Sequence, residues 1–533
     1  MVGYLKRKIY MIYNLNNLDK NTFDDKTYDF CIIGAGFAGI TLALNLDKKY
    51  KILLLEGGDY DFTVESQDIY KGKVVGHDYW RLEDSRIRCF GGSSNVWGKW
   101  AIPYEERDFE KKPYAKLSGW PISKKDLDPY LEQTNEIFEM SKAFKPYSNA
   151  KGWDDVLKKP NDDFEGFYIP ITPVDFKEKF GPEIKKSKNI DCYLNANLTD
   201  MTLSDDHSTV IGVEVKNYNK DTFTPKAKTF ILATGGMENA RLLLSFNKQC
   251  KNGIGNDNDQ VGRYFCEHPQ FQAGTFILED HTKALFKSKE YHFEHKFLRP
   301  TGKYMEENKV LNFGIRIETE SFLSKDIKNK TLSRTFKDKV KGIVCESEWL
   351  TGMVVTYYKD GASLLCETND LVKRVRDGRI VYNGEQISNA SSRILLSKNE
   401  VDKFGMKRIE FDWNFTKIDL ETARKSVLSF AKVFAMHNIG RLKVDDWILS
   451  DKVDFPTIEH GRPGPHHMCT TRMSDTPKEG VVDVNCKLFG IDNFYIGGSS
   501  IFSSSGEVNP TFTIVQMTLR LAKYFNESQS ANS

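Results

Sequence analysis

The residues from Gly34 to Gly39 have the types and spacing of a turn that binds phosphate. They read Gly34-Ala-Gly36-Phe-Ala-Gly39, which is a G-x-G-x-x-G pattern. In such a turn the first glycine permits a tight bend, the second leaves room for a pyrophosphate, and the third lets a helix approach the sheet. The N-terminus of that helix offers N–H groups and partial positive charge to the phosphates. Gly34, Gly36 and Gly39 are therefore candidate cofactor-binding residues.

The segments around these glycines are the ones that the pattern requires. The apolar run at 28–33 predicts a buried strand, ITLALNLDKKY at 40–50 has the apolar spacing of a helix, and KILLLE at 51–56 predicts a second strand. Together they predict a β-α-β unit of about 30 residues that opens a dinucleotide-binding domain. Glu56, at the end of the second strand, is placed to accept hydrogen bonds from an adenosine ribose. The pattern alone does not distinguish NAD from FAD.

Several separate blocks of the chain resemble, in the same order, those of the glucose–methanol–choline (GMC) oxidoreductases. The resemblance implies FAD as the cofactor and oxidation of an alcohol as the reaction. Its C-terminal part, with HHMCTTRM at 466–473 and GEVNPT at 506–511, is similar to the pyranose-oxidase and sugar-dehydrogenase branch. The blocks are the glycine turn with Glu56-Gly-Gly58, Arg88-Cys-Phe-Gly-Gly-Ser-Ser-Asn-Val-Trp-Gly98, Leu232-Ala-Thr-Gly-Gly-Met-Glu-Asn-Ala-Arg241, Val261-Gly-Arg-Tyr-Phe-Cys-Glu-His-Pro269, and residues 466–520.

The resemblance also implies which residues contact the flavin. Members of the family with covalent FAD carry a linking histidine at the position of Val96, and valine cannot form that bond, so we expect non-covalent FAD. Asn95 is expected to hydrogen-bond near the isoalloxazine. Besides the three glycines and Glu56, the predicted cofactor-binding residues are Gly92, Ser93, Asn95, Val96, Ala233, Asn239, Gly498, Pro510 and Thr511.

By the same resemblance, His466 and Asn509 carry the chemistry. Alcohol oxidation needs a base for the hydroxyl proton while hydride passes to flavin N5, and a neutral imidazole suits this because its pKa lies near working pH. His467 is the competing base, since adjacent residues on an extended segment point to opposite sides. Asn509 matches the residue that holds the substrate oxygen, although it could serve only as the cap of the helix that Pro510 opens. The N-terminus of that helix would stabilise the anionic reduced flavin.

The positions of the predicted strands along the sequence indicate that the FAD-binding domain is discontinuous. The apolar runs at 229–232 and 493–496 also lead into glycines, so they can share one parallel sheet with 28–33. Stretches such as KVLNFGIRIETE and GIVCESEWLTGMVVTYYK alternate or are β-branched, which predicts an antiparallel sheet, and LETARKSVLSFAKVFAMHNIG predicts a helix that ends at its glycine.

We therefore predict an α/β protein. It combines a Rossmann-like FAD-binding domain of the GMC type, also called p-hydroxybenzoate hydroxylase-like, with an α+β substrate domain that contains an antiparallel sheet. We expect the FAD-binding domain at 27–105, 190–267 and 460–528, the substrate-binding domain with its insertions at 106–189 and 268–459, and an N-terminal extension at 1–26. That extension is either a surface segment or a strand that docks elsewhere.

Composition excludes several other classes of protein. The chain has 533 residues, of which 40% are apolar and 28% charged, and its net charge is +2, so nothing predicts a nucleic-acid partner. No window reaches the ~18 apolar residues needed to span a bilayer, and no signal peptide is evident. The nine cysteines are odd in number and form no CxxC pair, which argues against a zinc site or a disulfide framework. We expect no metal, reduced thiols and a cytoplasmic protein.

The predicted function is oxidation of a secondary hydroxyl of a sugar or glycoside. O2 or another electron acceptor would be the second partner, so oxidase and dehydrogenase remain open. The alternatives are a flavin-containing lyase without net redox, a GMC dehydrogenase acting on a non-sugar alcohol, and an FAD-stabilised binding protein without turnover. Aromatic and polar residues in the middle of the chain suit a sugar ring, although each could instead fill a sheet core. They are Tyr291, His292, His295, Trp349, Tyr357 and Tyr358.

Overall fold

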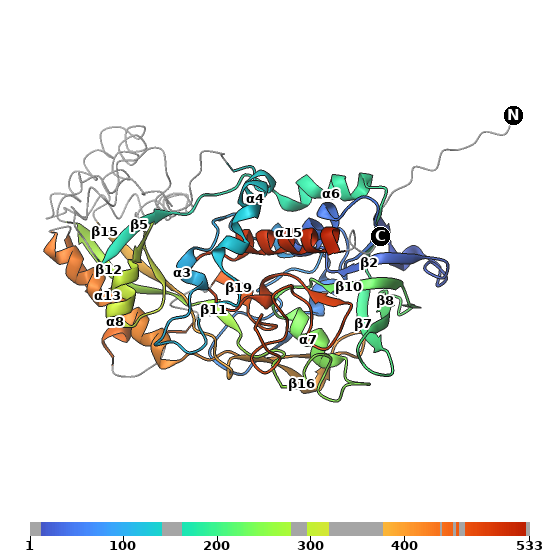
Figure 1. Cartoon of the computed structure of the whole chain (residues 1–533). Coiled ribbons are helices and arrows are strands. Elements are labelled where there is room, and N and C mark those ends of the chain that lie inside the picture. Colours follow the sequence, from blue (N-terminus) through green and yellow to red (C-terminus); the bar gives the residue numbers. More distant parts are fainter. Residues whose placement is uncertain are drawn as a thin grey trace, which may run out of the picture.

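The predicted β-α-β unit forms part of a six-stranded parallel sheet in the computed structural model of the chain (Figure 1). The strand before the glycine turn lies near the middle of this sheet, between the strands that end at Leu55 and Leu232. The structure describes residues 12–140, 163–278, 296–318, 377–437, 440–450, 455–457 and 464–528. The strand order is β1 (Ile12–Asn14), β6 (Ile190–Leu194), β3 (Ile52–Leu55), β2 (Thr27–Ile33), β10 (Lys226–Leu232) and β20 (Phe494–Ile496).

Apolar runs explain why these strands occupy the interior. All four residues of β3 are buried, as are the last four of both β2 and β10. Runs that are apolar on both faces are typical of parallel strands covered on both sides. The short strand β1 pairs in parallel with β6, so the residues before 27 contribute an edge strand to this sheet. The domain boundaries themselves stay a prediction.

Two helices begin at the carboxyl ends of these strands and cover the sheet. Helix α1 (Phe37–Asn45) follows the glycine turn, and helix α15 (Thr511–Ser528) follows Pro510. They pack against each other, and α1 also contacts α6 (Phe176–Lys186). Both helix N-termini therefore lie beside the carboxyl edge of the sheet, where open α/β sheets bind their ligands.

A second sheet of six strands is entirely antiparallel, as the alternating sequence pattern predicts. Figure 1 shows the two large sheets towards opposite ends of the molecule, with β11, β19 and α15 between them. The predicted strand region at 342–359 lies outside the described residues. The order is β18 (Gly440–Val444), β12 (Gln270–Leu278), β15 (Asp377–Gly384), β14 (Phe313–Glu318), β13 (Lys296–Pro300) and β5 (Phe164–Tyr168).

The long predicted helix covers this second sheet as α13 (Lys417–Met436). Its buried face, including Val427 and Phe430, shares a hydrophobic cluster with Ile315 and Ile380 of the sheet. The prediction that the helix runs to Gly440 is wrong. Helix α13 ends at Met436, and Gly440 is the first residue of β18, which pairs with Leu278 at the edge of the sheet.

Three smaller sheets connect these parts. The pair β11 (Cys266–His268) and β19 (Gly464–Met468) is antiparallel and brings the segment with His466 and His467 beside the sequence block at 261–269. Strand β4 (Gly72–Val74) pairs with β17 (Lys407–Asp412), which pairs with β16 (Arg393–Val401), so a strand of one predicted domain joins a strand of the other. The third sheet is β7 (Asn197–Leu203), β8 (Val210–Lys216) and β9 (Thr222–Phe223). The other helices are α2 (Val64–Asp68), α3 (Glu106–Phe109), α4 (Leu131–Ile137), α7 (Glu238–Ser245), α8 (Gly302–Asn308) and α14 (Asp446–Leu449), and the 3-10 helices are Leu15–Asn17, Gly92–Asn95, Lys124–Asp126, Asp128–Tyr130 and Ser499–Ile501.

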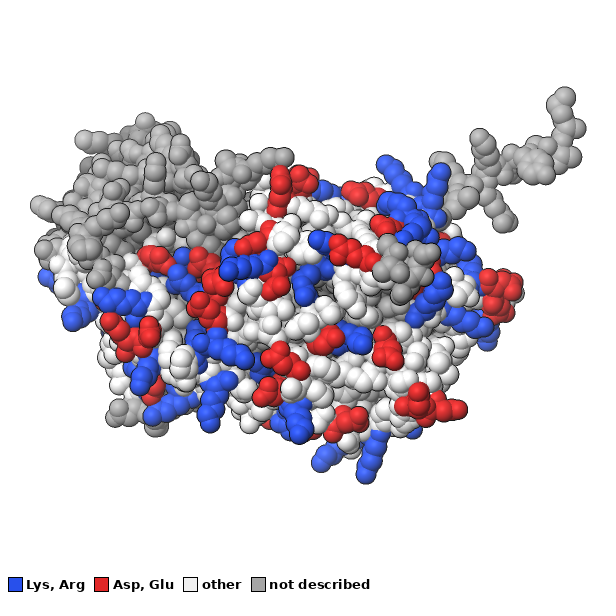
Figure 2. Space-filling model, viewed as in Figure 1, with Lys and Arg blue, Asp and Glu red and all other residues white. Residues whose placement is uncertain are grey.

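Charges are mixed on the face of the molecule seen in Figure 2, where basic and acidic side chains alternate without a continuous patch of one sign. This distribution agrees with the near balance of charge in the sequence. Among the described residues, no helix is both long and apolar enough to cross a membrane.

Candidate active site

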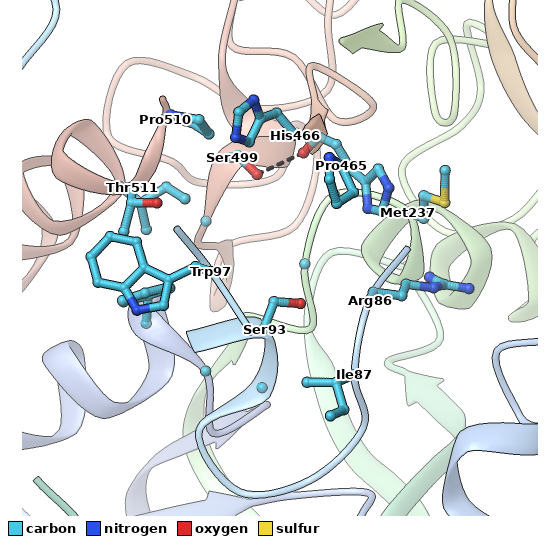
Figure 3. Close-up of a pocket in the computed structure, with 18 of the residues that line it drawn as sticks. Arg86, Ile87, Ser93, Trp97, Met237, Pro465, His466, Ser499, Pro510 and Thr511 are labelled. Atoms are coloured by element: carbon cyan, nitrogen blue, oxygen red, sulfur yellow. Dashed lines mark hydrogen bonds between the residues drawn. The ribbon is translucent and has the colours of Figure 1, made fainter. Parts of the chain in front are cut away.

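A cavity of about 420 Å³ lies at the carboxyl edge of the parallel sheet and extends towards the antiparallel sheet. In Figure 3, Trp97, Pro510 and Thr511 lie on one side of it and Arg86 and Met237 on the other. Most of the predicted site residues line this cavity. They are Gly34, Gly36, Glu56, Gly92, Ser93, Val96, Ala233, His466, Gly498, Asn509, Pro510 and Thr511.

The glycine turn has the geometry that its pattern predicts. Gly34 has φ of +108°, and a Cβ atom there would lie 2.4 Å from the carbonyl oxygen of Ala233. A Cβ atom at Gly39 would lie 1.8 Å from the carbonyl oxygen of Gly34, so the helix can approach the strand only because residue 39 is glycine. Gly39 does not line the cavity. It acts by letting α1 aim its N-terminus there.

Glu56 both lines the cavity and fastens the turn. Its two carboxylate oxygens accept hydrogen bonds from the backbone N–H of Ala35, at 3.0 Å, and of Gly58, at 2.8 Å. Burial raises the pKa of Glu56, while the nearby Arg88 guanidinium and these backbone N–H groups oppose the rise. The carboxylate is thus held in a fixed orientation at the edge of the cavity.

The loop at 88–98, which contains the position of the linking histidine in family members with covalent FAD, presents three of its predicted residues to the cavity, namely Gly92, Ser93 and Val96. Ser93 and Val96 are exposed there, and the side chain of Val96 is 64% exposed although it is apolar. Asn95, which is predicted to hydrogen-bond near the isoalloxazine, does not line the cavity. Its Nδ2 donates to the carbonyl oxygens of Phe90, at 3.0 Å, and Gly92, at 2.8 Å, so the amide braces the loop instead of lining the cavity.

Asn239, another predicted cofactor-binding residue, does not line the cavity either. Its Oδ1 accepts from the backbone N and the hydroxyl of Thr234, at 2.8 and 2.7 Å. Its Nδ2 donates to the carbonyl oxygen of Gly497, at 3.1 Å, and to Ser500, at 2.8 Å. The fully buried amide therefore ties the end of β10 to the end of β20.

The structure brings His466 and Asn509 together on the cavity wall. Nε2 of His466 lies 3.0 Å from Nδ2 of Asn509. The His466 side chain is 23% exposed, and its pKa is lowered well below the usual value by burial and by the neighbouring His268 and His467. His466 is therefore neutral at physiological pH and can accept a proton. The amide nitrogen of Asn509 is directed at the imidazole.

His467 lines the cavity as well, but its ring is engaged elsewhere. Nε2 of His467 lies 3.1 Å from the hydroxyl of Tyr79, and burial lowers the pKa of His467 to about 3. Cys469, three residues after His466, has φ of +69° in the left-handed region. That conformation favours glycine.

A buried carboxyl group and a second histidine stand behind His466, and sequence analysis assigned neither of them a role. The backbone N of His466 donates to both oxygens of Glu267, at 3.0 and 2.8 Å, and Tyr79 donates to one of them at 2.7 Å. Nδ1 of His268 lies 2.8 Å from Nδ1 of His466. The signal was present in the Cys266-Glu-His-Pro269 block. The carboxylate and the two imidazoles also bring potential metal-ligand atoms within 4.8 Å of one another, and hydrogen bonds account for their positions.

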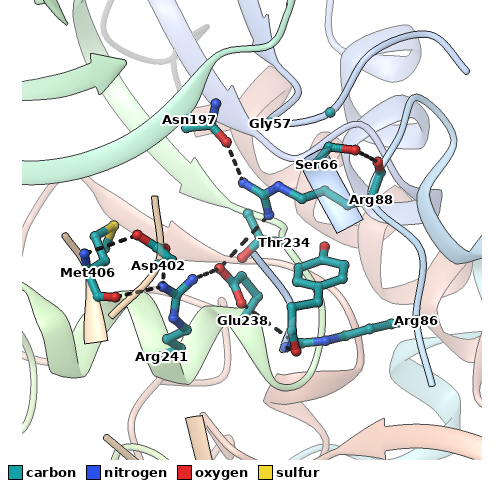
Figure 4. Close-up of polar contacts among 12 residues, drawn as sticks. Gly57, Ser66, Arg86, Arg88, Asn197, Thr234, Glu238, Arg241, Asp402 and Met406 are labelled. Carbon is teal, nitrogen blue, oxygen red and sulfur yellow. Dashed lines mark hydrogen bonds and ion pairs between the residues drawn. The ribbon is translucent and has the colours of Figure 1, made fainter. Parts of the chain in front are cut away.

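A buried ionic network supports the far wall of the cavity (Figure 4). The carboxylate oxygens of Glu238 lie 2.7 Å from Nη1 of Arg241 and 3.4 Å from Nη1 of Arg86. Arg241 also forms an ion pair with Asp402. All of these side chains are at most 7% exposed. The network joins helix α7 to Arg86, which lies just before the loop at 88–98, and to the turn between β16 and β17.

The cavity fits an extended, phosphate-bearing cofactor. A Cβ atom added to Gly36 would meet no atom closer than 4.0 Å, so open space lies beside the glycine that must admit a pyrophosphate. Nε of Arg86 and Nε of Arg88 are buried without a hydrogen-bond partner among the described residues, and both residues line the cavity. Together with the exposed Val96, these features match what FAD would cover and satisfy.

Comparisons with known proteins agree with the family resemblance of the sequence. Residues 388–518 match the family model described as GMC oxidoreductase. The chain is 22% identical to the 2-methyl-1,2-propanediol dehydrogenase of Mycolicibacterium austroafricanum, over 95% of this chain and 96% of that protein. It is 21% identical to the fructose dehydrogenase large subunit of Gluconobacter japonicus, over 60% of this chain and 51% of that protein.

Its fold is similar to that of a pyridoxine 4-oxidase from Mesorbium loti, with a TM-score of 0.56, 13% identity, and coverage of 94% of this chain and 99% of that one. The matching family model spans the two segments that carry His466 and Asn509. The parallel sheet, the glycine turn at its carboxyl edge and the relatives thus point the same way: residues 388–518 match the GMC oxidoreductase model, and the chain is similar to dehydrogenases and, in its fold, to an oxidase.

Proposed function

We propose that this enzyme oxidises a secondary hydroxyl of a sugar-type alcohol, with His466 as the base and Asn509 as the group that holds the substrate oxygen. The observation that carries the proposal is the 3.0 Å contact between Nε2 of His466 and Nδ2 of Asn509 on the cavity wall. A base and a donor that are already in contact can both reach one hydroxyl oxygen.

In the proposed reaction, His466 takes the hydroxyl proton at Nε2 while the carbon–hydrogen bond loses a hydride and the alcohol becomes a carbonyl compound. Asn509 donates to the oxygen and limits its rotation, so the bond to be broken keeps one direction. When bound, FAD supplies the hydride acceptor. The residues that would hold it are the glycine turn, Glu56, and the loop that contains Ser93 and Val96.

The second sheet supports a polyhydroxylated substrate. Gln270 and Asn383, which pair across β12 and β15, bring two amides to the cavity. Trp100 and Phe297, whose rings lie 5.8 Å apart, add aromatic faces. Amides around an aromatic wall suit a sugar, whose ring has apolar faces and a hydroxylated rim. The residues predicted from the sequence for this purpose, Tyr291, His292, His295, Trp349, Tyr357 and Tyr358, lie outside the described residues.

The relatives support two substrate classes. A fructose dehydrogenase subunit favours a sugar, whereas the relative that matches nearly the whole chain is named for a small diol. A non-sugar alcohol is therefore the second candidate. The test is an anaerobic screen in which bleaching of the flavin is followed with sugars, glycosides, polyols, nucleotide sugars, small diols, and long-chain or aryl alcohols. Faster reduction by a sugar-type compound than by all others supports the proposal, and the opposite order overturns it. A lyase would turn over without any bleaching.

We further propose that FAD is bound without a covalent link and that the enzyme is cytoplasmic. Val96 offers no nucleophile at the linking position, and the cysteines of the described residues are free, namely Cys31, Cys89, Cys192, Cys250, Cys266, Cys469 and Cys486. Acid precipitation should release all flavin as FAD, and flavin fluorescence that stays with the denatured polypeptide on a gel contradicts this. Cell fractionation tests the location, and recovery of the enzyme outside the cytoplasm contradicts it. Either O2 or another acceptor would reoxidise the flavin, and the rate of reoxidation in air separates oxidase from dehydrogenase.

A further inference from the structure

His268 stands between the proposed base and a backbone carbonyl group. Its Nε2 lies 3.0 Å from the carbonyl oxygen of Ser505, and its Nδ1 lies 2.8 Å from Nδ1 of His466. The ring is 1% exposed, and it does not line the cavity. His268 therefore contacts the base from behind, where no substrate reaches it.

These contacts determine which nitrogen carries hydrogen on each ring. A carbonyl oxygen only accepts, so Nε2 of His268 must carry the hydrogen that it donates to Ser505. A neutral imidazole has one N–H group, which leaves Nδ1 of His268 as an acceptor. Nδ1 of His466 must then be the donor in the 2.8 Å contact, and Nε2 of His466 is left with its lone pair.

The contact between Asn509 and His466, on the cavity side of the ring, requires the same tautomer of His466. Nδ2 of Asn509 is a donor, and it lies 3.0 Å from Nε2 of His466. A donor at that position is satisfied only by an Nε2 atom without hydrogen. Two groups on opposite sides of the ring, Ser505 through His268 and Asn509 directly, thus specify one tautomer.

We propose that His268 is a positioning residue that holds His466 in the tautomer with hydrogen on Nδ1 and a free lone pair on Nε2. This inference rests on the proposed role of His466 as the base. Without an acceptor behind it, His466 could carry its hydrogen on Nε2, and that tautomer cannot take a proton from a substrate hydroxyl. The logic is that of the orienting group in hydrolytic triads, where loss of the correct tautomer lowers kcat by about 10⁴-fold.

The surroundings keep the two rings in place. Strands β11 and β19 pair with each other, and the backbone N–H groups of His268 and His466 both donate to the carboxyl group of Glu267, at 2.9 Å and 2.8 to 3.0 Å. After proton uptake, the contact from Nδ1 of His466 to His268 becomes a charge-assisted hydrogen bond, which is stronger than a neutral one. His268 then stabilises the imidazolium without receiving its proton.

The test uses the FAD-loaded enzyme with ¹⁵N-labelled histidine rings and the variants His268→Leu and His268→Asn. Leucine removes the acceptor, whereas the amide oxygen of asparagine can accept in the place of Nδ1. In the unmodified enzyme, the NMR spectrum should show hydrogen on Nδ1 of His466 and on Nε2 of His268, with signals assigned by their loss in His466→Ala and His268→Asn. His268→Leu should shift His466 towards the other tautomer, and His268→Asn should restore the original one.

Flavin reduction supplies a second readout. We expect His268→Leu to slow it by about 10- to 100-fold, part of the usual contribution of a general base, and His268→Asn to stay within about fivefold of the unmodified enzyme. The NMR measurement of the tautomer requires no substrate. Its result therefore remains valid even if no sugar reduces the flavin and the proposed function is wrong. Hydrogen on Nδ1 of His268 in the unmodified enzyme overturns the proposal, even if the leucine variant does not fold. An unchanged tautomer of His466 in a folded leucine variant overturns it as well.

Discussion

Replacing Glu267 by glutamine should remove a rise in the rate of flavin reduction that the unmodified enzyme shows at alkaline pH. Burial raises the pKa of Glu267 to about 8, while hydrogen bonds from His268, Tyr79 and His466 partly oppose the rise. The carboxyl group is therefore neutral at pH 7 and becomes an anion as the pH passes 8. One of its oxygens lies 3.8 Å from Nδ1 of His466.

The size of the effect follows from that distance. Two unit charges 4 Å apart interact with about 4 kcal/mol at an effective dielectric constant of 20. If about half of the positive charge on His466 has developed in the transition state, the anion lowers the barrier by about 2 kcal/mol, or roughly 30-fold in rate. Because about a tenth of Glu267 is already ionised at pH 7 and about nine tenths at pH 9, the rate of flavin reduction should rise by about 5- to 10-fold between these two pH values.

Anaerobic stopped-flow reduction at saturating substrate measures this rate directly. Glu267→Gln keeps the size and one acceptor of the side chain but does not ionise, so its rate should stay near the value of the unmodified enzyme at pH 7 throughout. The other ionisable groups around Glu267 do not titrate in this range, because burial raises the pKa of Tyr79 well above its usual value and lowers that of His268 to about 4. An equal rise in the glutamine variant, or no rise in the unmodified enzyme, refutes the reasoning.

Further expected results concern other parts of the site. His466→Ala should slow flavin reduction by roughly 10²–10⁴-fold with FAD retained, and His467→Ala should slow it less; stopped-flow traces with the opposite ranking contradict the assignment of the base. Glu56→Ala should lower the flavin-to-protein absorbance ratio more than the reduction rate, and full retention of FAD with loss of reduction argues against its ribose role. Asp402→Asn leaves Arg241 buried with one partner fewer and should destabilise the fold by about 3–5 kcal/mol in urea unfolding; a loss below about 1 kcal/mol shows that the network is dispensable.

The parts of the molecule that local patterns specify were predictable from the sequence. The glycine turn could be predicted because its strand, helix and second strand follow one another in a single short stretch of sequence. The antiparallel sheet and helix α13 were also predictable, because alternation and helical spacing reflect one buried face. The end of α13 was not, since the glycine that looked like a helix terminus is used instead to start an edge strand.

Side chains whose partners come from distant segments were not predictable in the same way. Asn95 and Asn239 have the right types to contact a cofactor, but Nδ2 of Asn95 donates to backbone carbonyl groups of its own loop, and the amide of Asn239 bonds to backbone and hydroxyl groups near Thr234, Gly497 and Ser500. His268 meets His466 only because β11 pairs with β19, which is about 200 residues further along the chain. The spacing of residues along the chain does not predict such a contact. A motif such as the block at 261–269 can identify the residues but not their partners.

The order in which the strands of the parallel sheet lie along the chain has a consequence for biosynthesis. Strand β2 leaves the ribosome early, but β20 and α15, which complete its sheet and cover α1, follow more than 450 residues later. At 5–20 residues per second, this delay is roughly half a minute to a minute and a half. During this delay, the cavity beside the glycine turn lacks the wall residue Gly498 and the helix that starts at Thr511. The cavity is therefore incomplete until translation has passed residue 511, so we expect FAD to bind stably only after that point.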